Sequence, residues 1–155
     1  MDTSVQHIEL ERTIDGLYEA FDAYPLKARL DCCPHCELDA AERRLHLRPL
    51  RELTWTELGI FSFRALTTFG DEDDFRHFLP RLLELYALDH AGAPYTLFML
   101  FEKLNAAAWT RWPADEVAAI RRFIDAWKRV LTARARDSEQ GAWELDELSG
   151  GISVL

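Results

Sequence analysis

Two cysteines separated by two residues, Cys33 and Cys36, are the side chains whose spacing most directly allows chemistry. Such a pair can close a redox disulfide or bind a metal ion. In thioredoxin-like oxidoreductases the pair lies at the start of a helix that follows a β-strand. Residues 25–30 do not have the pattern of a strand, and the chain has no βαβ pattern. The sequence therefore disfavours thiol redox catalysis.

A zinc site would need two ligands beyond this pair, because structural zinc sites are closed and tetrahedral. The chain has no second Cys-x-x-Cys motif. Folding can bring His77 to the loop, and we name it as the third candidate ligand beside Cys33 and Cys36. The other available donors are Cys32, His35 and His46. The favoured interpretation is that both cysteines are small, buried side chains beside a helix start, because free cysteines are often buried.

A run of carboxylates from Asp71 to Asp74 is the second group that could carry chemistry, and His77 follows it. These residues could bind a divalent cation, or His77 could act as a base beside Asp73 or Asp74. The run lacks the glycine and terminal glutamate of a calcium loop. Consecutive acids also point in different directions, and acids at a helix N-terminus cap free amides. Capping and a solvated face are therefore the favoured roles of Asp71, Glu72, Asp73 and Asp74.

The elements that must position these residues are helical, because apolar residues recur at steps of three and four. The stretches expected to be helices are 3–23, 39–47, 54–69, 71–86, 94–104 and 117–131. We expect Asp39 to cap the second, a capping box of Thr54 and Glu57 to start the third, and Gly70 to end it. Pro80 should either kink the fourth helix or start a new one. The apolar stretch 94–104 is expected in the middle of the core.

No stretch alternates with period two, so we predict an all-α fold, a helical bundle or short array of about five to seven helices. Residues 1–136 are expected to form a single helical domain. Residues 137–155 are expected to form an acidic C-terminal tail whose apolar residues allow part of it to dock. The chain has no signal-peptide pattern and no run of about 20 apolar residues, so we expect a cytoplasmic protein without membrane partners. Its clustered cysteines are expected to be reduced.

The net charge of the 155-residue chain is −9, and the acids are concentrated in three stretches. These are residues 1–24, which include Glu9 and Asp15, residues 71–92, and residues 137–155, which contain no Lys or Arg. Such a surface repels the phosphates of nucleic acids and attracts basic proteins. Solubility and internal ion pairing are the alternative role of these acids, and the favoured one.

Several motifs resemble those of a group of uncharacterised bacterial helical proteins. They are Cys-x-x-Cys at 33–36, Arg-Pro-Leu-Arg-Glu-Leu at 48–53, Ala-Leu-Thr-Thr-Phe-Gly-Asp at 65–71, Asp-Phe-Arg-His-Phe-Leu-Pro-Arg at 74–81 and Ala-Trp-x-x-Trp-Pro at 108–113. The likeness spans about residues 33–131. It implies a bacterial domain family whose signature is the segment 74–85, and it implies no activity.

The chain has no glycine-rich phosphate loop, nucleophile elbow or paired metal-binding histidine motif. We therefore predict a non-catalytic interaction protein that binds a basic protein partner, with a toxin-neutralising immunity protein as one concrete form. The acids expected at the contact are Glu9, Asp15, Asp71, Glu72, Asp73 and Asp74. One alternative is a zinc-stabilised regulatory or scaffold domain that uses Cys33, Cys36 and His77. The other is an enzyme with His77 as its base.

Overall fold

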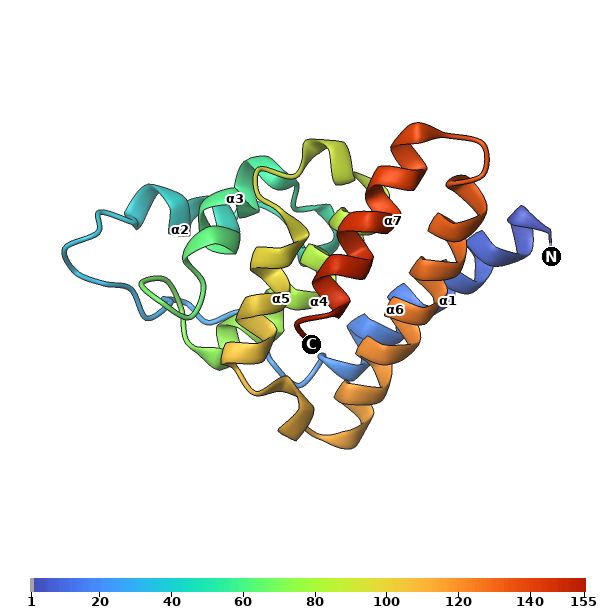
Figure 1. Cartoon of the computed structure of the whole chain (residues 1–155). Coiled ribbons are helices and arrows are strands. Elements are labelled where there is room, and N and C mark those ends of the chain that lie inside the picture. The colour runs from blue at the N-terminus through green and yellow to red at the C-terminus, as the bar shows by residue number, and fades with distance from the viewer. Residues whose placement is uncertain (1) are drawn as a thin grey trace.

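The computed structural model describes residues 2–155, and over this range the fold is all-α (Figure 1). Its α-helices are α1 (Thr3–Ala20), α2 (Asp39–Leu45), α3 (Trp55–Arg64), α4 (Glu72–Leu88), α5 (Leu97–Ala106), α6 (Ala114–Arg134) and α7 (Glu139–Ile152). Short 3-10 helices lie at Leu50–Glu52, His90–Gly92 and Trp109–Arg111. Within the described residues, β-type pairing is limited to two isolated bridges that both involve Phe69. The predicted all-α class is therefore confirmed.

The two longest helices, α1 and α6, pack side by side along one edge of the molecule (Figure 1). α7 folds back from the end of α6 and packs against α6 and α5, while α2 and α3 pack together at the opposite end. α4 lies between these groups and is buried around most of its surface. Its buried apolar residues are Phe75, Phe78, Leu79, Pro80, Leu82, Leu83, Leu85 and Tyr86. The prediction that 94–104 forms the middle of the core is wrong, because α4 has that place and Phe98 of α5 is 41% exposed.

Side-chain caps fix the starts of α3 and α4. At α3, the predicted capping box is present, and the backbone N–H of Thr54 donates to Glu57 over 2.7 Å. At α4, the N–H of Asp74 donates to the Asp71 carboxylate over 3.0 Å, and the N–H of Asp71 donates back to Asp74 over 2.9 Å. The acid run therefore performs the favoured capping role, through Asp71 and Asp74.

The end of α3 differs from the prediction, because the helix stops at Arg64 and not at Phe69. Ala65 is extended (ψ 140°) and Leu66 takes a left-handed conformation (φ 65°), which redirects the chain. The amides of residues 67–69 then donate to the carbonyl of Arg64. Gly70 is left-handed (φ 77°) as a chain-reversing glycine should be, but it leads into α4 and does not end α3.

The starts of α2 and α5 also differ from the prediction, and the structure decides between the two alternatives at Pro80. Asp39 is the first residue of α2 and makes no capping hydrogen bond, since Leu38 occupies the cap position. A single helix, α4, runs through Pro80, so no new helix starts at this residue. α5 begins at Leu97 and not at Pro94, because a 3-10 turn and an extended segment precede it.

The C-terminal segment is helical and packs on the rest of the chain. Leu148 of α7 is fully buried, and the Ser138 hydroxyl caps the helix by accepting from the N–H of Gly141 over 3.1 Å. Residues 139–152 therefore share the packing of the body. Among residues 2–155, none of the helices combines the length and apolar character that crossing a membrane requires.

Candidate functional site

An open groove with a volume of about 550 Å³ lies between α5 and α7. Its lining consists of Thr96, Phe98, Trp143, Asp146, Glu147, Gly150 and Gly151. A smaller hollow of about 230 Å³ continues it, shares Thr96, Trp143 and Glu147, and adds His90, Ala93, Pro94 and Tyr95. We call the two together the α5–α7 groove.

Close contact between α5 and α7 depends on Gly151. A Cβ atom at this position would lie 2.6 Å from Cδ2 of Phe101, whose side chain is fully buried. A Cβ atom at Gly150 would meet nothing within 4 Å, because that residue faces the open groove. The pair of glycines therefore brings α7 against α5 and leaves the groove floor free of side chains.

Two aromatic side chains stand exposed at this groove. Trp143 is 53% exposed and Phe98 is 41% exposed. Helical spacing places Asp146 and Glu147 on the same face of α7 as Trp143, three and four residues later. The same spacing places Glu102 one turn after Phe98 on α5. The groove therefore combines exposed aromatic surface with carboxylates, and α7 itself contains no Lys or Arg.

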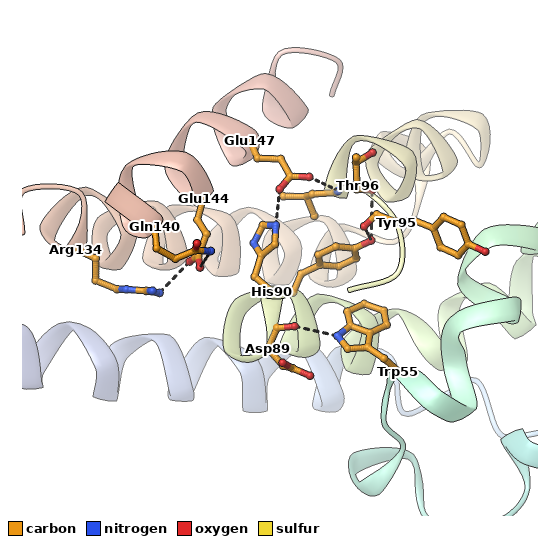
Figure 2. A network of polar contacts seen from close by, with 11 residues as sticks. Trp55, Asp89, His90, Tyr95, Thr96, Arg134, Gln140, Glu144 and Glu147 are labelled. Carbon is orange, nitrogen blue, oxygen red and sulfur yellow. Dashed lines mark hydrogen bonds and ion pairs between the residues drawn. The ribbon is translucent and has the colours of Figure 1, made fainter. Parts of the chain in front are cut away.

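Glu147 connects α7 to the start of α5 (Figure 2). One carboxylate oxygen accepts from the backbone N–H of Leu97 over 2.9 Å, and the other lies 2.5 Å from Nε2 of His90. Thr96, the residue at the cap position of α5, makes no side-chain capping bond. Glu147 therefore supplies from α7 the cap that α5 lacks locally, since helix N-terminal amides need an acceptor.

His90 lies in an aromatic enclosure below this carboxylate. His90 is 7% exposed. The ring centres of Trp143, Tyr86 and Trp127 lie 5.1, 5.7 and 6.3 Å from that of His90. The Tyr86 hydroxyl donates to the carbonyl of Tyr95 over 2.9 Å. Burial raises the pKa of Tyr86, and the negative charge of Glu147 adds a smaller effect in the same direction. These contacts fix the chain between α4 and α5, so His90 and Glu147 hold the groove in shape.

The N-terminal half of α7 is fixed by a separate polar cluster, also drawn in Figure 2. Glu144 is 5% exposed and accepts from Arg134 of α6 and from Gln140, each over 3.0 Å. In addition, Trp55 donates from Nε1 to the carbonyl of Asp89 over 3.0 Å, which secures the segment that leads to His90. The groove is therefore built on anchored elements.

The predicted contact acids Asp71 and Asp74 lie elsewhere, at the start of α4. Lys27 bonds Asp71 over 2.6 Å and lies 3.4 Å from Asp74. Asp74 is only 3% exposed, and its burial raises its pKa. Both acids therefore serve the cap and an internal ion pair.

The remaining predicted contact acids are also mostly paired within the chain. The pairs are Glu72 with Arg76, Glu9 with Arg129 over 2.7 Å, and Asp15 with Arg51 over 2.9 Å. Among residues 2–155, Asp73 alone of the six predicted acids has no ion-pair partner in the chain. Internal pairing, the alternative favoured from the sequence, therefore accounts for five of them.

The structure does not bring Cys33, Cys36 and His77 together. In the described range, 2–155, no three His, Cys, Asp or Glu side chains are arranged to hold a metal ion. His77 donates from Nδ1 to the carbonyl of Tyr24 over 2.7 Å. Cys33 and Cys36 are only half-buried in the loop before α2, so the interpretation of both as buried side chains is wrong.

His77 lies beside a different groove, with a volume of about 400 Å³ and a lining that includes Tyr18, Arg51 and Pro80. Burial lowers the pKa of His77. The carboxylate of Asp74 is already engaged by the cap and Lys27, and Nδ1 of His77 bonds a carbonyl. The predicted pairing of His77 with a neighbouring acid therefore does not form.

Sequence reasoning missed the groove residues Phe98, Trp143, His90 and Glu147. Phe98 was expected in the core and Trp143 in a tail, although the spacing of Trp143, Asp146 and Glu147 on one helical face was available in the sequence. The contact of His90 with Glu147, by contrast, joins residues 57 positions apart and left no local signal.

Comparison with protein-family models, curated proteins and solved structures finds no match to this chain.

Proposed function

We propose that this protein is a non-catalytic interaction protein whose α5–α7 groove binds a basic, amphipathic segment of a partner protein. The observation that carries the proposal is the exposure of Trp143 and Phe98 beside the exposed carboxylate of Asp146. A toxin-neutralising immunity protein, which covers the basic cleft of a nucleic-acid-directed toxin, is the concrete form we favour.

Apolar exposure supports a binding role for this face. Exposed aromatic surface gathered at a groove is typical of protein interaction sites, whereas scattered apolar residues are not. Tryptophan is also the residue that most often contributes strongly to binding when a partner buries it. Trp143 lines both parts of the groove.

Charge supports a basic partner. Within residues 2–155, neither Asp146 nor Glu102 has an ion-pair partner in the chain. Both are exposed. A partner that presents Lys or Arg around an apolar side chain would complement both the carboxylates and the aromatic rings, and charge complementarity speeds and orients such encounters.

The roles of His90 and Glu147 support binding over acid–base chemistry. The carboxylate of Glu147 is already shared between His90 and the N-terminus of α5. The His90 ring is enclosed by aromatic side chains and does not line the larger part of the groove. Both residues therefore act in holding the shape of the binding surface.

A direct test uses a fluorescently labelled synthetic amphipathic helix of leucine and lysine, titrated with the protein while anisotropy is recorded. We expect W143A to weaken binding by about tenfold, which corresponds to about 1.4 kcal/mol. D146K should weaken binding at low salt, and the effect should shrink as salt is added.

Two matched variants serve as controls. I8A removes an exposed apolar side chain from α1, where Ile8 is 49% exposed, and D73K makes the same charge change at the start of α4. Neither should alter the affinity by more than about twofold, because both sites lie away from the groove. Equal affinities of W143A and wild type, or a larger loss in D73K than in D146K, would remove the groove as the binding surface.

A further inference from the structure

The loop before α2, which contains the three cysteines, is anchored and does not hang free. The N–H of Cys33 donates to the carbonyl of Thr68 over 2.9 Å, and the N–H of Gly70 donates to the carbonyl of Asp31. An isolated antiparallel bridge joins Cys32 to Phe69. The loop lies at the end of the molecule opposite α7, so it is separate from the α5–α7 groove (Figure 1).

A turn within this loop brings Cys33 and Cys36 together. The N–H of Cys36 donates to the carbonyl of Cys33 over 3.1 Å, which closes a four-residue turn with Pro34 at its second position. The ends of such a turn lie less than about 7 Å apart, which overlaps the Cα separation of disulfide-bonded cysteines. The backbone of this turn therefore sets the two cysteines at a separation that a disulfide can span.

Both sulfurs are placed where a small molecule can reach them. Cys33 and Cys36 are only half-buried, and the residues between them, Pro34 and His35, are exposed. Among residues 2–155 the structure offers the pair no third metal ligand. A closed zinc site would need four ligands, so the geometry favours bond formation between the two sulfurs over metal binding.

We propose that Cys33 and Cys36 form a redox-active dithiol that undergoes thiol–disulfide exchange with small-molecule disulfides such as oxidised glutathione. The Cys33 thiolate attacks one sulfur of the disulfide, forms a mixed disulfide and releases one glutathione thiolate, which takes up a proton. The Cys36 thiol then loses its proton, attacks the Cys33 sulfur and releases the second glutathione. Two electrons pass from the protein thiols to glutathione, and a Cys33–Cys36 disulfide remains.

The surroundings of the three cysteines assign these roles. The pKa of Cys33 is lowered, first by the hydrogen bond from Cys36 and then by the backbone N–H of His35, with Arg64 adding a smaller effect. The pKa of Cys36 is raised, chiefly because it shares that hydrogen bond with Cys33. Burial raises the pKa of Cys32. Cys33 is therefore the attacking thiol, Cys36 resolves the mixed disulfide, and Cys32 stays reduced.

The small ring that a Cys33–Cys36 disulfide would close indicates a role in exchange and not in stabilising the fold. A disulfide between Cys33 and Cys36 encloses only the turn itself, and a short ring constrains the unfolded chain least. Since the helices are already packed without this bond, the fold does not need it. A disulfide of this kind is open to reduction as well as formation, which is what exchange chemistry requires.

Oxidised glutathione itself is the probe for the test. Reduced protein is incubated with it near neutral pH and quenched with acid. The remaining thiols are alkylated, and the peptides are identified by mass spectrometry. We expect a Cys33–Cys36 disulfide with Cys32 alkylated. C36S should accumulate the mixed disulfide at Cys33, and C33S should react about tenfold more slowly than wild type.

C32S is the matched control, and it should react like wild type. The proposal is overturned if Cys33 and Cys36 both remain reduced, if Cys32 is the residue that pairs, or if C36S gives no mixed disulfide at Cys33. Protein that is purified without chelator and holds one equivalent of zinc on these cysteines would also overturn it. None of these measurements involves the α5–α7 groove, so they test the dithiol independently of the interaction function.

Discussion

Replacing each of the two adjacent glycines of α7 by alanine should change stability in opposite directions. Gly150 and Gly151 have the same helical neighbours, so a Cβ atom gives both the same gain in helix propensity, about 0.5–1 kcal/mol. Only the surroundings differ. At Gly150 the new Cβ meets nothing within 4 Å, so we expect G150A to stabilise the protein by up to about 1 kcal/mol.

At Gly151 the new Cβ would lie 2.6 Å from Cδ2 and 2.9 Å from Cε2 of Phe101. Carbon atoms pack at about 3.5–4.0 Å, so α7 or the Phe101 ring must move by about 1 Å. The ring is fully buried, and overpacking of this kind costs about 1–3 kcal/mol. We therefore expect G151A to be less stable than G150A by about that amount, because the propensity gain cancels between the two variants.

Urea unfolding followed by circular dichroism measures both effects as free energies of unfolding. If the free energy of unfolding falls equally steeply with urea concentration in wild type, G150A and G151A, the comparison concerns the folded state. Equal stabilisation by G150A and G151A would contradict the close approach of α7 to α5. It would also remove the structural basis of the groove between them.

The remaining predictions concern His90, Glu147 and His77. E147A should lower the free energy of unfolding by about 2 kcal/mol, because it leaves the N–H of Leu97 and the buried His90 ring without an acceptor. The control D146A changes an exposed residue one position away. In the same urea experiment it should change the free energy of unfolding by less than about 0.5 kcal/mol. Burial lowers the pKa of His77 below its usual 6.5, so the unfolded chain binds this proton more readily than the folded chain, and stability should fall as the pH drops through and below that value. H77Q should lose less stability than wild type between about pH 7 and pH 5, and identical urea midpoints of the two proteins across that range would contradict the assignment.

Local patterns predicted most of the helices and the caps at α3 and α4. The capping box at Thr54 and the acids at Asp71 and Asp74 are short-range signals, because donor and acceptor lie within one turn of each other. The end of α3 was not predictable in this way. Its apolar period continues to Phe69, but the chain leaves the helix at Ala65 so that Phe69 can pack on Phe61 with ring centres 5.4 Å apart.

The candidate groove was less predictable than the fold, because its residues meet only after α7 has folded back. A net acidic stretch without bases suggested an acidic tail at 137–155 that docks only in part. In the structure its acids have separate roles, since Glu144 pairs with Arg134 and Glu147 caps α5. Pairings between residues 10 or 50 positions apart are not visible in local periodicity.

Charge counted along the chain therefore overstates the acidic surface that a partner can use. α6 supplies bases to the helices on both sides of it, through Arg129 to Glu9 of α1 and through Arg134 to Glu144 of α7. An acid already held in such a pair must lose that partner before it can bind a new one, and exposed pairs contribute little either way. An unpaired acid such as Asp146 has no ion-pair partner to lose, and it lies beside the exposed ring of Trp143. The proposed function therefore depends on the acid that the fold leaves next to Trp143, and not on the acids that are most numerous in the sequence.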